Sequence, residues 1–435
     1  AVVEKDQLGG TCLNRGCIPT KTLIASAELA AHARRGEEMG VRIPEVSPDY
    51  PAMAARKDKV VERLRGGVGS LLKANGVKVL TGSASFVSPR EVLVAGPEGE
   101  TRLGADKVII ATGSAPAVPG FVPKDGPVYT SRTLLELTEL PESIIVLGGG
   151  YIGCEFACLL ALLGVKVTVV EMLEDILFLL DRDARSEIKR SMKKMGVEVL
   201  TGSPLEDITA GAEGVSGRTG EKQVEAGAML VSVGRRPVTD GLKLEAIGLE
   251  LDDKGFIPVD EGCRTSVPGV FAVGDVNGII QLAHAATAQG LVAAENGCGG
   301  RQLRNESLVP ACIFTLPEVG AVGVSEAEAR EKGLAVKRAK FPFMACGKAL
   351  AAGESAGFVK LLADEATGRL LGAQAVGPHA TDLIAEAAVA IRAELTAHEL
   401  GATVHAHPTL AEVWMECAHV MEGRPVHSAP PRKPN

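Results

Sequence analysis

The sequence is poor in aromatic residues and contains no long stretch of uncharged apolar residues. Only 3% of its 435 residues are Phe, Trp or Tyr. The most apolar region, residues 156–170, is interrupted by Lys166, so no segment reaches the roughly 18 apolar residues that a membrane span needs. The formal net charge is −8 and no long basic run is present, which argues against a nucleic-acid partner. We therefore expect a soluble, cytoplasmic protein with neither a membrane nor a nucleic-acid partner.

The apolar residues that are present suit an α/β protein. They make up 46% of the chain and are mostly Ala, Val, Leu and Ile, beside 51 glycines. This composition is typical of strands and helices joined by glycine turns, and the length is ample for several domains of about 100–200 residues. The nine cysteines are an odd number, which fits a reducing compartment better than a disulfide scaffold.

Two of the cysteines, Cys12 and Cys17, are five positions apart. In a regular α-helix five residues rise about 7.5 Å, and the two Cα atoms would then be farther apart than the roughly 4.4–6.8 Å of a disulfide. Pairing therefore requires a distorted backbone, which Gly16 tolerates. Pro19 suits the first turn of a helix, and the positive end of such a helix favours a thiolate at Cys17.

We interpret the pair as a strained and therefore reducible disulfide. Three other interpretations compete with it: two free core cysteines, half of a zinc site, and a secretory disulfide. A zinc site needs further ligands at suitable spacing, and none is nearby. No signal peptide precedes the pair, which speaks against the secretory disulfide.

The chain opens with a segment, residues 1–4, that reads as the end of a strand closed by the acidic Glu4. In a dinucleotide-binding βαβ unit such a carboxylate binds a ribose hydroxyl about 20 residues after a glycine loop. An ordinary N-terminal strand is the alternative.

Hydrophobic periodicity predicts the elements that follow. Helices are expected at 20–35, 50–73, 282–296 and 381–393, and strands at 77–80, 91–94, 107–111, 197–200, 229–233 and 269–273. A segment rich in Pro and Ala, residues 114–123, is interpreted as a linker that marks a domain boundary.

A G-x-G-x-x-G segment, residues 148–153, lies between an apolar strand at 143–147 and a predicted helix at 154–163. The next strand, at 165–170, is followed by Glu171. Strand, loop, helix, strand and acid together indicate a dinucleotide site in which the helix N-terminus binds a pyrophosphate. Glu171 would accept hydrogen bonds from both ribose hydroxyls and repel a 2′-phosphate, which favours NAD over NADP.

Asp275 and His407 are further candidates for site residues. Asp275 follows a predicted strand, where its carboxylate is placed to bind ligand hydroxyls; a plain turn is the alternative. His407 precedes a proline that can open a helix, and Glu412 lies about one turn inside that helix, within reach of the imidazole as a partner that orients a base. A surface His beside a solvated Glu is the alternative for this pair, and His405 is interpreted as incidental.

Taken in order, these segments resemble those of the flavin disulfide reductases, in particular the dihydrolipoamide dehydrogenases. The segments are Gly-Gly-Thr-Cys-Leu-Asn-Arg-Gly-Cys-Ile-Pro-Thr-Lys, Ala-Thr-Gly-Ser, Gly-Gly-Gly-Tyr-Ile-Gly-Cys-Glu, Val-Gly-Arg-Arg-Pro, Phe-Ala-Val-Gly-Asp and His-Ala-His-Pro-Thr-Leu-Ala-Glu. The resemblance covers residues 1–425 and implies an α/β fold with two Rossmann-like dinucleotide-binding domains, the first incomplete, and an α+β C-terminal dimerisation domain. The implied parts are an FAD-binding domain at 1–117, an NAD-binding domain at 118–238, a central domain at 239–309, a dimerisation domain at 310–425 and a tail at 426–435.

The resemblance also implies roles for single residues. Cys12 would be the interchange thiol that meets the substrate, and Cys17 the thiol that contacts the flavin. His407 and Glu412 would form the base pair that a homodimer donates to the Cys12 of the second copy. The implied reaction oxidises dihydrolipoamide, carried on the lipoyl domains of a 2-oxoacid dehydrogenase or glycine cleavage complex, and passes the electrons through the Cys12–Cys17 disulfide and FAD to NAD⁺.

The cofactor-binding residues follow in the same way, and no metal is expected. Contacts to FAD are implied for Glu4, Thr112, Gly113 and Asp275. Contacts to NAD are implied for Gly148, Gly150, Gly153, Glu171 and Gly234. Lys21 would lie near the flavin, paired with Glu155. The other cofactor-binding candidates are Gly10, Thr11, Ser114, Tyr151, Ile152, Arg235, Gly274, Leu282, Ala283, His284 and Ala285.

Two kinds of alternative remain open. One is another disulfide reductase of the same family, although glutathione reductase-like enzymes carry basic residues where Glu171 stands and mercuric reductase-like enzymes carry a C-terminal cysteine pair where Cys417 is single. The other starts from the strand, glycine loop and helix, roughly 30 residues, that open the FAD domain in this family and do not appear before Ala1. We expect such an N-terminally truncated chain to bind FAD weakly, and at the extreme to serve only a structural or dimerisation role.

Overall fold

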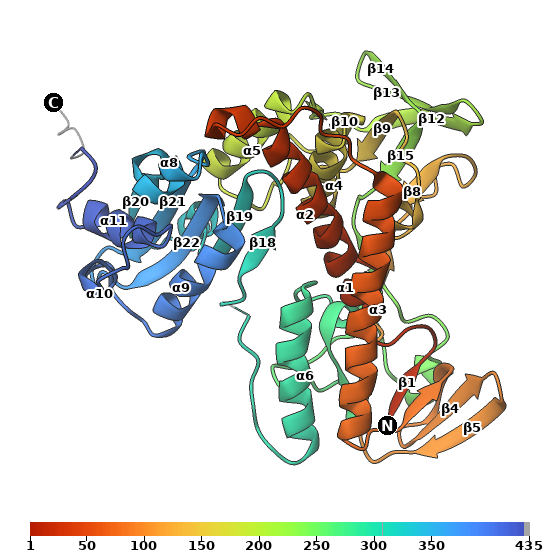
Figure 1. The fold of residues 1–435 in the computed structure, drawn as a ribbon. Helices are drawn as coiled ribbons and strands as arrows, with labels where there is room; N and C mark the ends of the chain where they lie inside the picture. The colour runs from red at the N-terminus through yellow and green to blue at the C-terminus, as the bar shows by residue number, and fades with distance from the viewer. Residues whose placement is uncertain (307, 430–435) are drawn as a thin grey trace.

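The computed structural model describes residues 1–306 and 308–429. The long helices α2 (Cys17–Arg34) and α3 (Tyr50–Ala74) lie side by side and connect its upper and lower parts in Figure 1. Both helices are confirmed as predicted. α3 begins after Asp49, whose side chain accepts a hydrogen bond from the Ala52 amide at 2.9 Å and so satisfies a donor of the first turn.

Two separate parallel strand pairs lie next to the N-terminus in space or contribute to the same core. β1 (Val2–Glu4) pairs with β2 (Val79–Thr81), and β6 (Val108–Ile110) pairs with β17 (Val270–Ala272). Both pairs contribute to one apolar core. Beside them an antiparallel meander is formed by β3 (Ser83–Ser88), β4 (Glu91–Gly96) and β5 (Gly99–Gly104).

The middle of the chain builds a five-stranded parallel sheet of order β11-β10-β9-β15-β8. Its strands are β8 (Val128–Thr130), β9 (Ser143–Leu147), β10 (Lys166–Glu171), β11 (Glu198–Thr201) and β15 (Ala228–Val231). The helices α4 (Tyr151–Leu162) and α5 (Arg182–Lys194) pack against it, which explains why its central strands are continuous apolar runs. α4 begins three residues earlier than predicted because the loop residue Gly150 is its N-cap.

The sequence suggested that residues 114–123 form a linker, but part of this segment is a strand. Its first residues form β7 (Ser114–Pro116), which pairs antiparallel with β16 (Arg235–Pro237). The chain therefore enters and leaves the five-stranded sheet region through one paired crossing, a long-range pairing that local composition does not reveal. Between these crossings lies a second meander of β12 (Leu205–Gly211), β13 (Gly214–Thr219) and β14 (Lys222–Ala226).

The C-terminal part is a five-stranded antiparallel sheet with helices packed on it. The order is β18-β19-β22-β21-β20, with β18 (Ala311–Ile313), β19 (Glu318–Gly323), β20 (Val336–Pro342), β21 (Phe358–Asp364) and β22 (Leu370–Gly377). The helices of this part are α7 (Glu326–Glu331), α8 (Gly347–Ala351), α9 (Ala380–Arg392), α10 (Ala397–Ala402) and α11 (Glu412–Met421). The buried Trp414 donates from Nε1 to the Leu383 carbonyl at 3.0 Å, which fastens α11 to α9.

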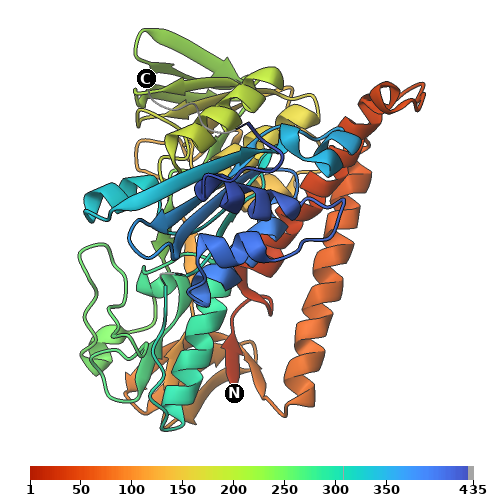
Figure 2. The same ribbon diagram turned by 90° about the vertical axis from the view of Figure 1, so that its left-hand side faces the viewer.

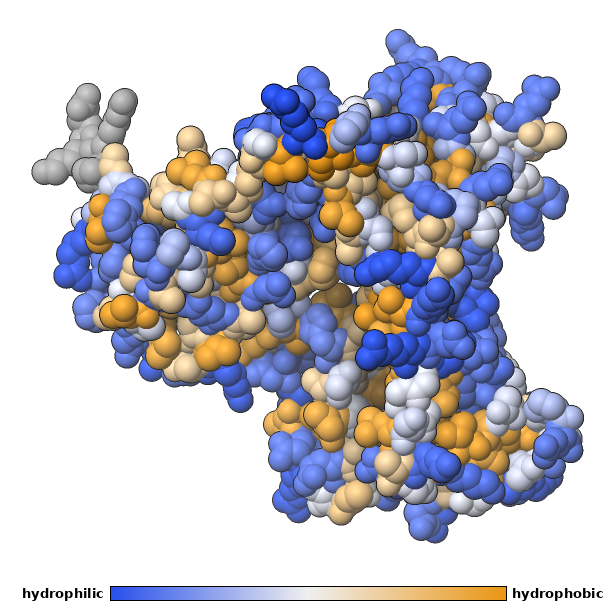
Figure 3. Space-filling view, in the orientation of Figure 1, coloured by the Kyte–Doolittle hydropathy of each residue, from blue (hydrophilic) through white to orange (hydrophobic). Residues whose placement is uncertain are grey.

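The C-terminal part forms its own lobe, drawn in blue on the left of Figure 1 and towards the viewer in Figure 2. The surface shown in Figure 3 is hollowed between this lobe and the rest of the molecule. The helix α6 (Ala283–Gly297) lies below the hollow. No helix of the described residues has the length and apolarity for crossing a membrane. Of the predicted tail at 426–435, residues 430–435 lie outside the described residues.

Candidate active site

Cys12 and Cys17 lie on either side of a break between two helices. α1 (Gly10–Arg15) contains Cys12, and α2 begins at Cys17. The break is at Gly16, whose backbone angles of φ −142° and ψ −109° are not helical. The prediction that Gly16 distorts the backbone between the two cysteines is confirmed. Both cysteines are free thiols in the structure.

The two thiols are hydrogen-bonded to each other, and this contact separates their acidities. The hydrogen bond to Cys12 and the charge of Lys21 together lower the pKa of Cys17 to about 7, against the effect of burial. The same hydrogen bond, burial and the nearby Cys17 charge raise the pKa of Cys12. Because α2 begins at Cys17, the helix N-terminus also favours a thiolate there. The site therefore holds one thiol that ionises near neutral pH beside one that stays protonated.

Lys21 links the thiol pair to the five-stranded sheet region. Its Nζ donates to Glu155 Oε2 at 2.6 Å and lies 4.5 Å from the centre of the Phe314 ring. Glu155 Oε1 accepts a hydrogen bond from the Phe314 amide at 2.9 Å. Side chains from α2, α4 and the segment after β18 thus meet at one point, and the implied pairing of Lys21 with Glu155 is present.

The glycine loop between β9 and α4 depends on the absence of side chains. Gly148 has a φ of +105°, and a Cβ on it would lie 2.6 Å from the Ser232 carbonyl oxygen. A Cβ on Gly153 would lie 2.0 Å from the Gly148 carbonyl oxygen. At Gly150, by contrast, a Cβ would meet nothing within 4 Å, and no side chain caps α4. The start of α4 is therefore neither capped by a side chain nor blocked in front of Gly150, as an anion site requires.

Glu171 ends β10 and fixes the same loop. Its Oε2 accepts a hydrogen bond from the Gly149 amide at 2.7 Å, and its Oε1 accepts one from the Leu173 amide at 2.8 Å. Each carboxylate oxygen keeps a second lone pair for a ligand hydroxyl. Tyr151 and Ile152 form the first turn of α4 beside it.

Ser114, Arg235 and Asp275 form a compact polar cluster. Arg235 donates from Nε to Ser114 Oγ at 2.6 Å and from Nη2 to the Ser114 carbonyl at 2.8 Å. Its Nε lies 3.5 Å from Asp275 Oδ2, to which the Ser114 hydroxyl also donates. The sequence predicted the three residues separately, but only the pairing of β7 with β16 brings Ser114 and Arg235 together.

Other predicted cofactor residues surround this region. Glu4 Oε1 accepts a hydrogen bond from the Asp6 amide at 2.9 Å, and Thr112 donates from Oγ1 to the Val238 carbonyl at 2.6 Å. Thr11, in α1, is exposed. Open space lies in front of three of the predicted glycines, where a Cβ would meet nothing within 4 Å: Gly10, Gly113 and Gly234.

The start of α6 is held close to this region. The Gly274 amide donates to Gln289 Oε1 at 2.8 Å, which ties the turn that carries Asp275 to α6. His284 Nε2 lies 2.8 Å from the Pro310 carbonyl oxygen. The N-cap and first turn of α6 consist of Leu282, Ala283, His284 and Ala285.

His407 and Glu412 form the predicted pair on the surface of the C-terminal lobe. His407 Nδ1 lies 2.9 Å from Glu412 Oε1, and Glu412 Oε2 accepts a hydrogen bond from the Thr409 amide at 2.9 Å. Burial opposes ionisation of Glu412, but the Thr409 amide and His407 hold its pKa below the usual value. The His407 side chain is 78% exposed. α11, which follows the pair, is on the far left of Figure 1, whereas α1 with Cys12 is at the centre, so one chain does not bring the two together.

Comparison with known families decides the assignment. Residues 1–290 match the pyridine nucleotide-disulphide oxidoreductase family, and residues 309–418 match the dimerisation domain of that family. The chain belongs to the pyridine nucleotide-disulphide oxidoreductases. Its relatives include the dihydrolipoyl dehydrogenase of Chlamydia pneumoniae, which is 43% identical over 99% of this chain and 93% of the relative. That of Geobacillus stearothermophilus is 42% identical over 98% of this chain and 92% of the relative.

Solved structures resemble this oxidoreductase over nearly its whole length. LpdA from Mycobacterium tuberculosis is 30% identical with a TM-score of 0.90, and covers 96% of this chain and 92% of its own. The HOCl-induced flavoprotein disulfide reductase RclA from Escherichia coli is 29% identical with a TM-score of 0.87, over 96% of this chain and 93% of its own. The α/β fold with a C-terminal dimerisation domain is therefore confirmed.

One buried ionic cluster in this oxidoreductase was missed from the sequence. Lys360 on β21 is 1% exposed, and its Nζ lies 2.6 Å from Asp181, 2.9 Å from Asp183 and 2.7 Å from Glu326. Burial alone would lower the pKa of Lys360, but the three carboxylates raise it above its usual value. The cluster joins the start of α5 to the dimerisation domain. Its signal in the sequence is a single lysine inside the apolar run Phe-Val-Lys-Leu-Leu.

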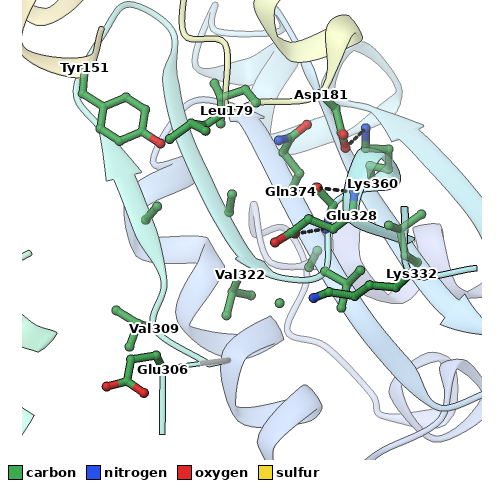
Figure 4. A pocket seen from close by; sticks show the side chains of 18 residues that line it. Tyr151, Leu179, Asp181, Glu306, Val309, Val322, Glu328, Lys332, Lys360 and Gln374 are labelled. Atoms are coloured by element: carbon green, nitrogen blue, oxygen red, sulfur yellow. Dashed lines mark hydrogen bonds and ion pairs between the residues drawn. The ribbon is translucent and has the colours of Figure 1, made fainter. Parts of the chain in front are cut away.

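A cavity of about 240 Å³ lies beside this cluster. Figure 4 shows Tyr151 from α4, Leu179 and Asp181 from the segment before α5, and Lys360 and Gln374 from the dimerisation sheet, around the space. Among the charges that line it, Asp181 pairs with Lys360, as Figure 4 shows, and Glu328 caps the start of α7. The cavity thus lies where the start of α5 meets the C-terminal sheet.

Proposed function

We propose that this protein is a dihydrolipoyl dehydrogenase, a homodimer that oxidises dihydrolipoamide to lipoamide with FAD and NAD⁺. The observation that carries the proposal is the thiol pair itself, in which Cys17 ionises near neutral pH next to the Lys21–Glu155 pair that joins α2 to α4. Relatives at 43% identity carry the name of this activity. The odd number of cysteines, nine, fits work in a reducing compartment such as the cytoplasm.

The residues present fit both cofactors. The uncapped start of α4 in front of Gly150 fits a pyrophosphate, and Glu171 fits a ribose. The Ser114–Asp275 cluster offers a carboxylate to the hydroxyls of a flavin side chain. When bound, the two cofactors supply a route for an electron pair from the thiol pair to NAD⁺. We assign FAD binding to 1–117 with 239–309, NAD binding to 118–238 and dimerisation to 310–425.

In the proposed reaction the oxidised enzyme carries a Cys12–Cys17 disulfide. A substrate thiolate attacks Cys12 Sγ, the S–S bond breaks, and Cys17 leaves as a thiolate. A leaving thiol of lower pKa leaves faster, and the charge of Lys21, which lowers the pKa of Cys17, also stabilises the Cys17 thiolate that leaves when Cys12 is attacked. The second substrate thiolate then attacks the substrate sulfur of the mixed disulfide. Cys12 leaves, takes up a proton, and lipoamide is released.

His407 is the base that removes the proton from the substrate thiol. Glu412 orients its ring through Nδ1 and leaves Nε2 to face the substrate. Because His407 is exposed and remote from Cys12 of its own chain, we propose that it acts on the Cys12 of a second copy. The lipoyl domains of a 2-oxoacid dehydrogenase or glycine cleavage complex would deliver the dihydrolipoamide.

The test is the absorbance and activity of the purified chain. With FAD added, we expect bound-flavin absorbance and NADH-dependent reduction of lipoamide, and a protein that stays colourless and inactive with added FAD would overturn the proposal. Cys12→Ser and His407→Gln should each abolish most lipoamide turnover, whereas His398→Gln, at an exposed histidine of the same domain, should not. Full turnover in either of the first two variants would refute the role given to that residue.

A further inference from the structure

His405, two residues before His407, was interpreted as incidental from the sequence, yet its side chain is buried. Its side chain is 6% exposed, and its Nε2 lies 2.6 Å from Glu386 Oε1. Its Nδ1 lies 2.8 Å from the Thr403 carbonyl oxygen. Both ring nitrogens therefore lie within hydrogen-bond distance of acceptor oxygens, one on the Glu386 side chain and one on the Thr403 backbone.

This contact fastens one end of the loop that carries His407. Glu386 belongs to α9, a three-turn helix packed on β19 and β22. Thr403 is the residue after α10. His405 therefore ties the chain that leaves α10 to a helix packed on the central sheet.

The other end of the loop is fixed independently. Glu412, at the start of α11, holds both the His407 ring and the Thr409 amide. Thr409 in turn donates from Oγ1 to the Ala406 carbonyl at 2.7 Å. Between the His405 anchor and the Glu412 anchor, the His407 ring is held through Nδ1 and its side chain stays exposed.

We propose that Glu386 and His405 are positioning residues for His407. The inference rests on the proposed role of His407 as the base. Through the His405 anchor, Glu386 sets where the backbone presents the His407 imidazole to the substrate thiol of the second copy. Without Glu386 as acceptor, the buried His405 ring loses the hydrogen bond from Nε2, so the ring moves toward solvent and the loop shifts. A displacement of about 1 Å at a catalytic group can cost about 10²-fold in rate.

The experiment compares Glu386→Ala and Glu386→Gln in the flavin-loaded enzyme. Glu386→Ala should lower kcat for dihydrolipoamide by about 10²-fold with a smaller change in KM, and Glu386→Gln, which keeps an acceptor, should recover most of the rate. NADH-dependent reduction of ferricyanide needs no proton transfer by His407 and should stay unchanged in both. Asp382→Asn, at an exposed acid on the same helix, is the matched control and should leave both rates unchanged.

A double variant separates this inference from the proposed function. If Glu386 acts through His407, adding Glu386→Ala to His407→Gln should cause no further loss. Equal losses of both activities in Glu386→Ala and Glu386→Gln, or a further loss in the double variant, would overturn the positioning role and indicate a merely structural contact. If His407→Gln alone keeps full dihydrolipoamide turnover, the proposed function of His407 fails instead.

Discussion

Lys21 Nζ lies 2.6 Å from Glu155 Oε2, so a cation from α2 is paired with a carboxylate from α4 that is 134 positions away. The two charges act on Cys17 in opposite directions. Lys21 lowers the pKa of the thiol and Glu155 raises it. The pair therefore helps to set the acidity of the Cys17 thiol.

Replacing Lys21 by Met should raise the pKa of Cys17 above its value of about 7. The thiolate is the reactive form and exists above the pKa, so the pH at which Cys17 is half-alkylated by iodoacetamide should move upward in the reduced enzyme. Mass spectrometry of the Cys17 peptide measures this midpoint. Lys73→Met, at an exposed lysine of α3, is the control. An unchanged midpoint in Lys21→Met would contradict the electrostatic role.

Replacing Glu171 by Arg should weaken NADH use and improve NADPH use relative to it. The carboxylate holds the Gly149 and Leu173 amides, and hydrogen bonds to a charged group contribute about 1.5–3 kcal/mol, so kcat/KM for NADH should fall by about tenfold or more. The ratio of kcat/KM for the two nucleotides is the measurement. Glu174→Arg, at an exposed neighbour, is the control and should not change this ratio. An unchanged ratio in Glu171→Arg would refute the prediction.

Replacing Gly153 by Ala should damage the nucleotide loop. The new Cβ would lie 2.0 Å from the Gly148 carbonyl oxygen, which is backbone and cannot move aside without deforming the loop. We expect the Kd for NADH, measured by titration of the flavin-loaded enzyme, to rise by about tenfold or more. Gly66→Ala, in α3 with nothing within 4 Å of the new methyl, should bind NADH normally and gain about 1 kcal/mol of stability. Normal NADH affinity in Gly153→Ala would mean that the close approach does not shape the site.

Replacing Lys360 by Met should lower the free energy of unfolding by about 3–5 kcal/mol, because three carboxylates then lose their buried partner. Arg369→Met removes an exposed pair with Glu394 and should cost about 1 kcal/mol or less. Urea titration of both variants gives the comparison, and equal losses would refute it.

The same cluster predicts a pH dependence of stability. Burial raises the pKa values of Asp183 and Glu326, but the hydrogen bond and the charge of Lys360 outweigh it, so that both pKa values are lowered. Their contribution is therefore present above the usual pKa of an acidic side chain and is lost as the pH falls through the lower folded values. Urea titrations at a series of acidic pH values measure this effect. As the pH falls, the free energy of unfolding should decrease less in Lys360→Met than in the natural chain.

Local patterns predicted much of the fold. β9 and β10 are apolar runs, and α3 begins after its N-cap Asp49, so the patterns that define these elements lie within short stretches of sequence. The pairing of β7 with β16 was missed because it joins residues more than a hundred positions apart. The prolines and alanines of 114–123 carry no trace of that partner.

The sequence by itself determined the chemistry of the site. The spacing of Cys12 and Cys17 around Gly16, the glycine loop with Glu171, and the order His407–Glu412 were all readable, because each depends on residues close together in the chain. Only the tertiary structure decided which of them meet. It brought Lys21 to Glu155, Ser114 to Arg235 and Asp275, and His405 to Glu386. It also separated His407 from Cys12 of its own chain, since packing of whole domains sets these distances.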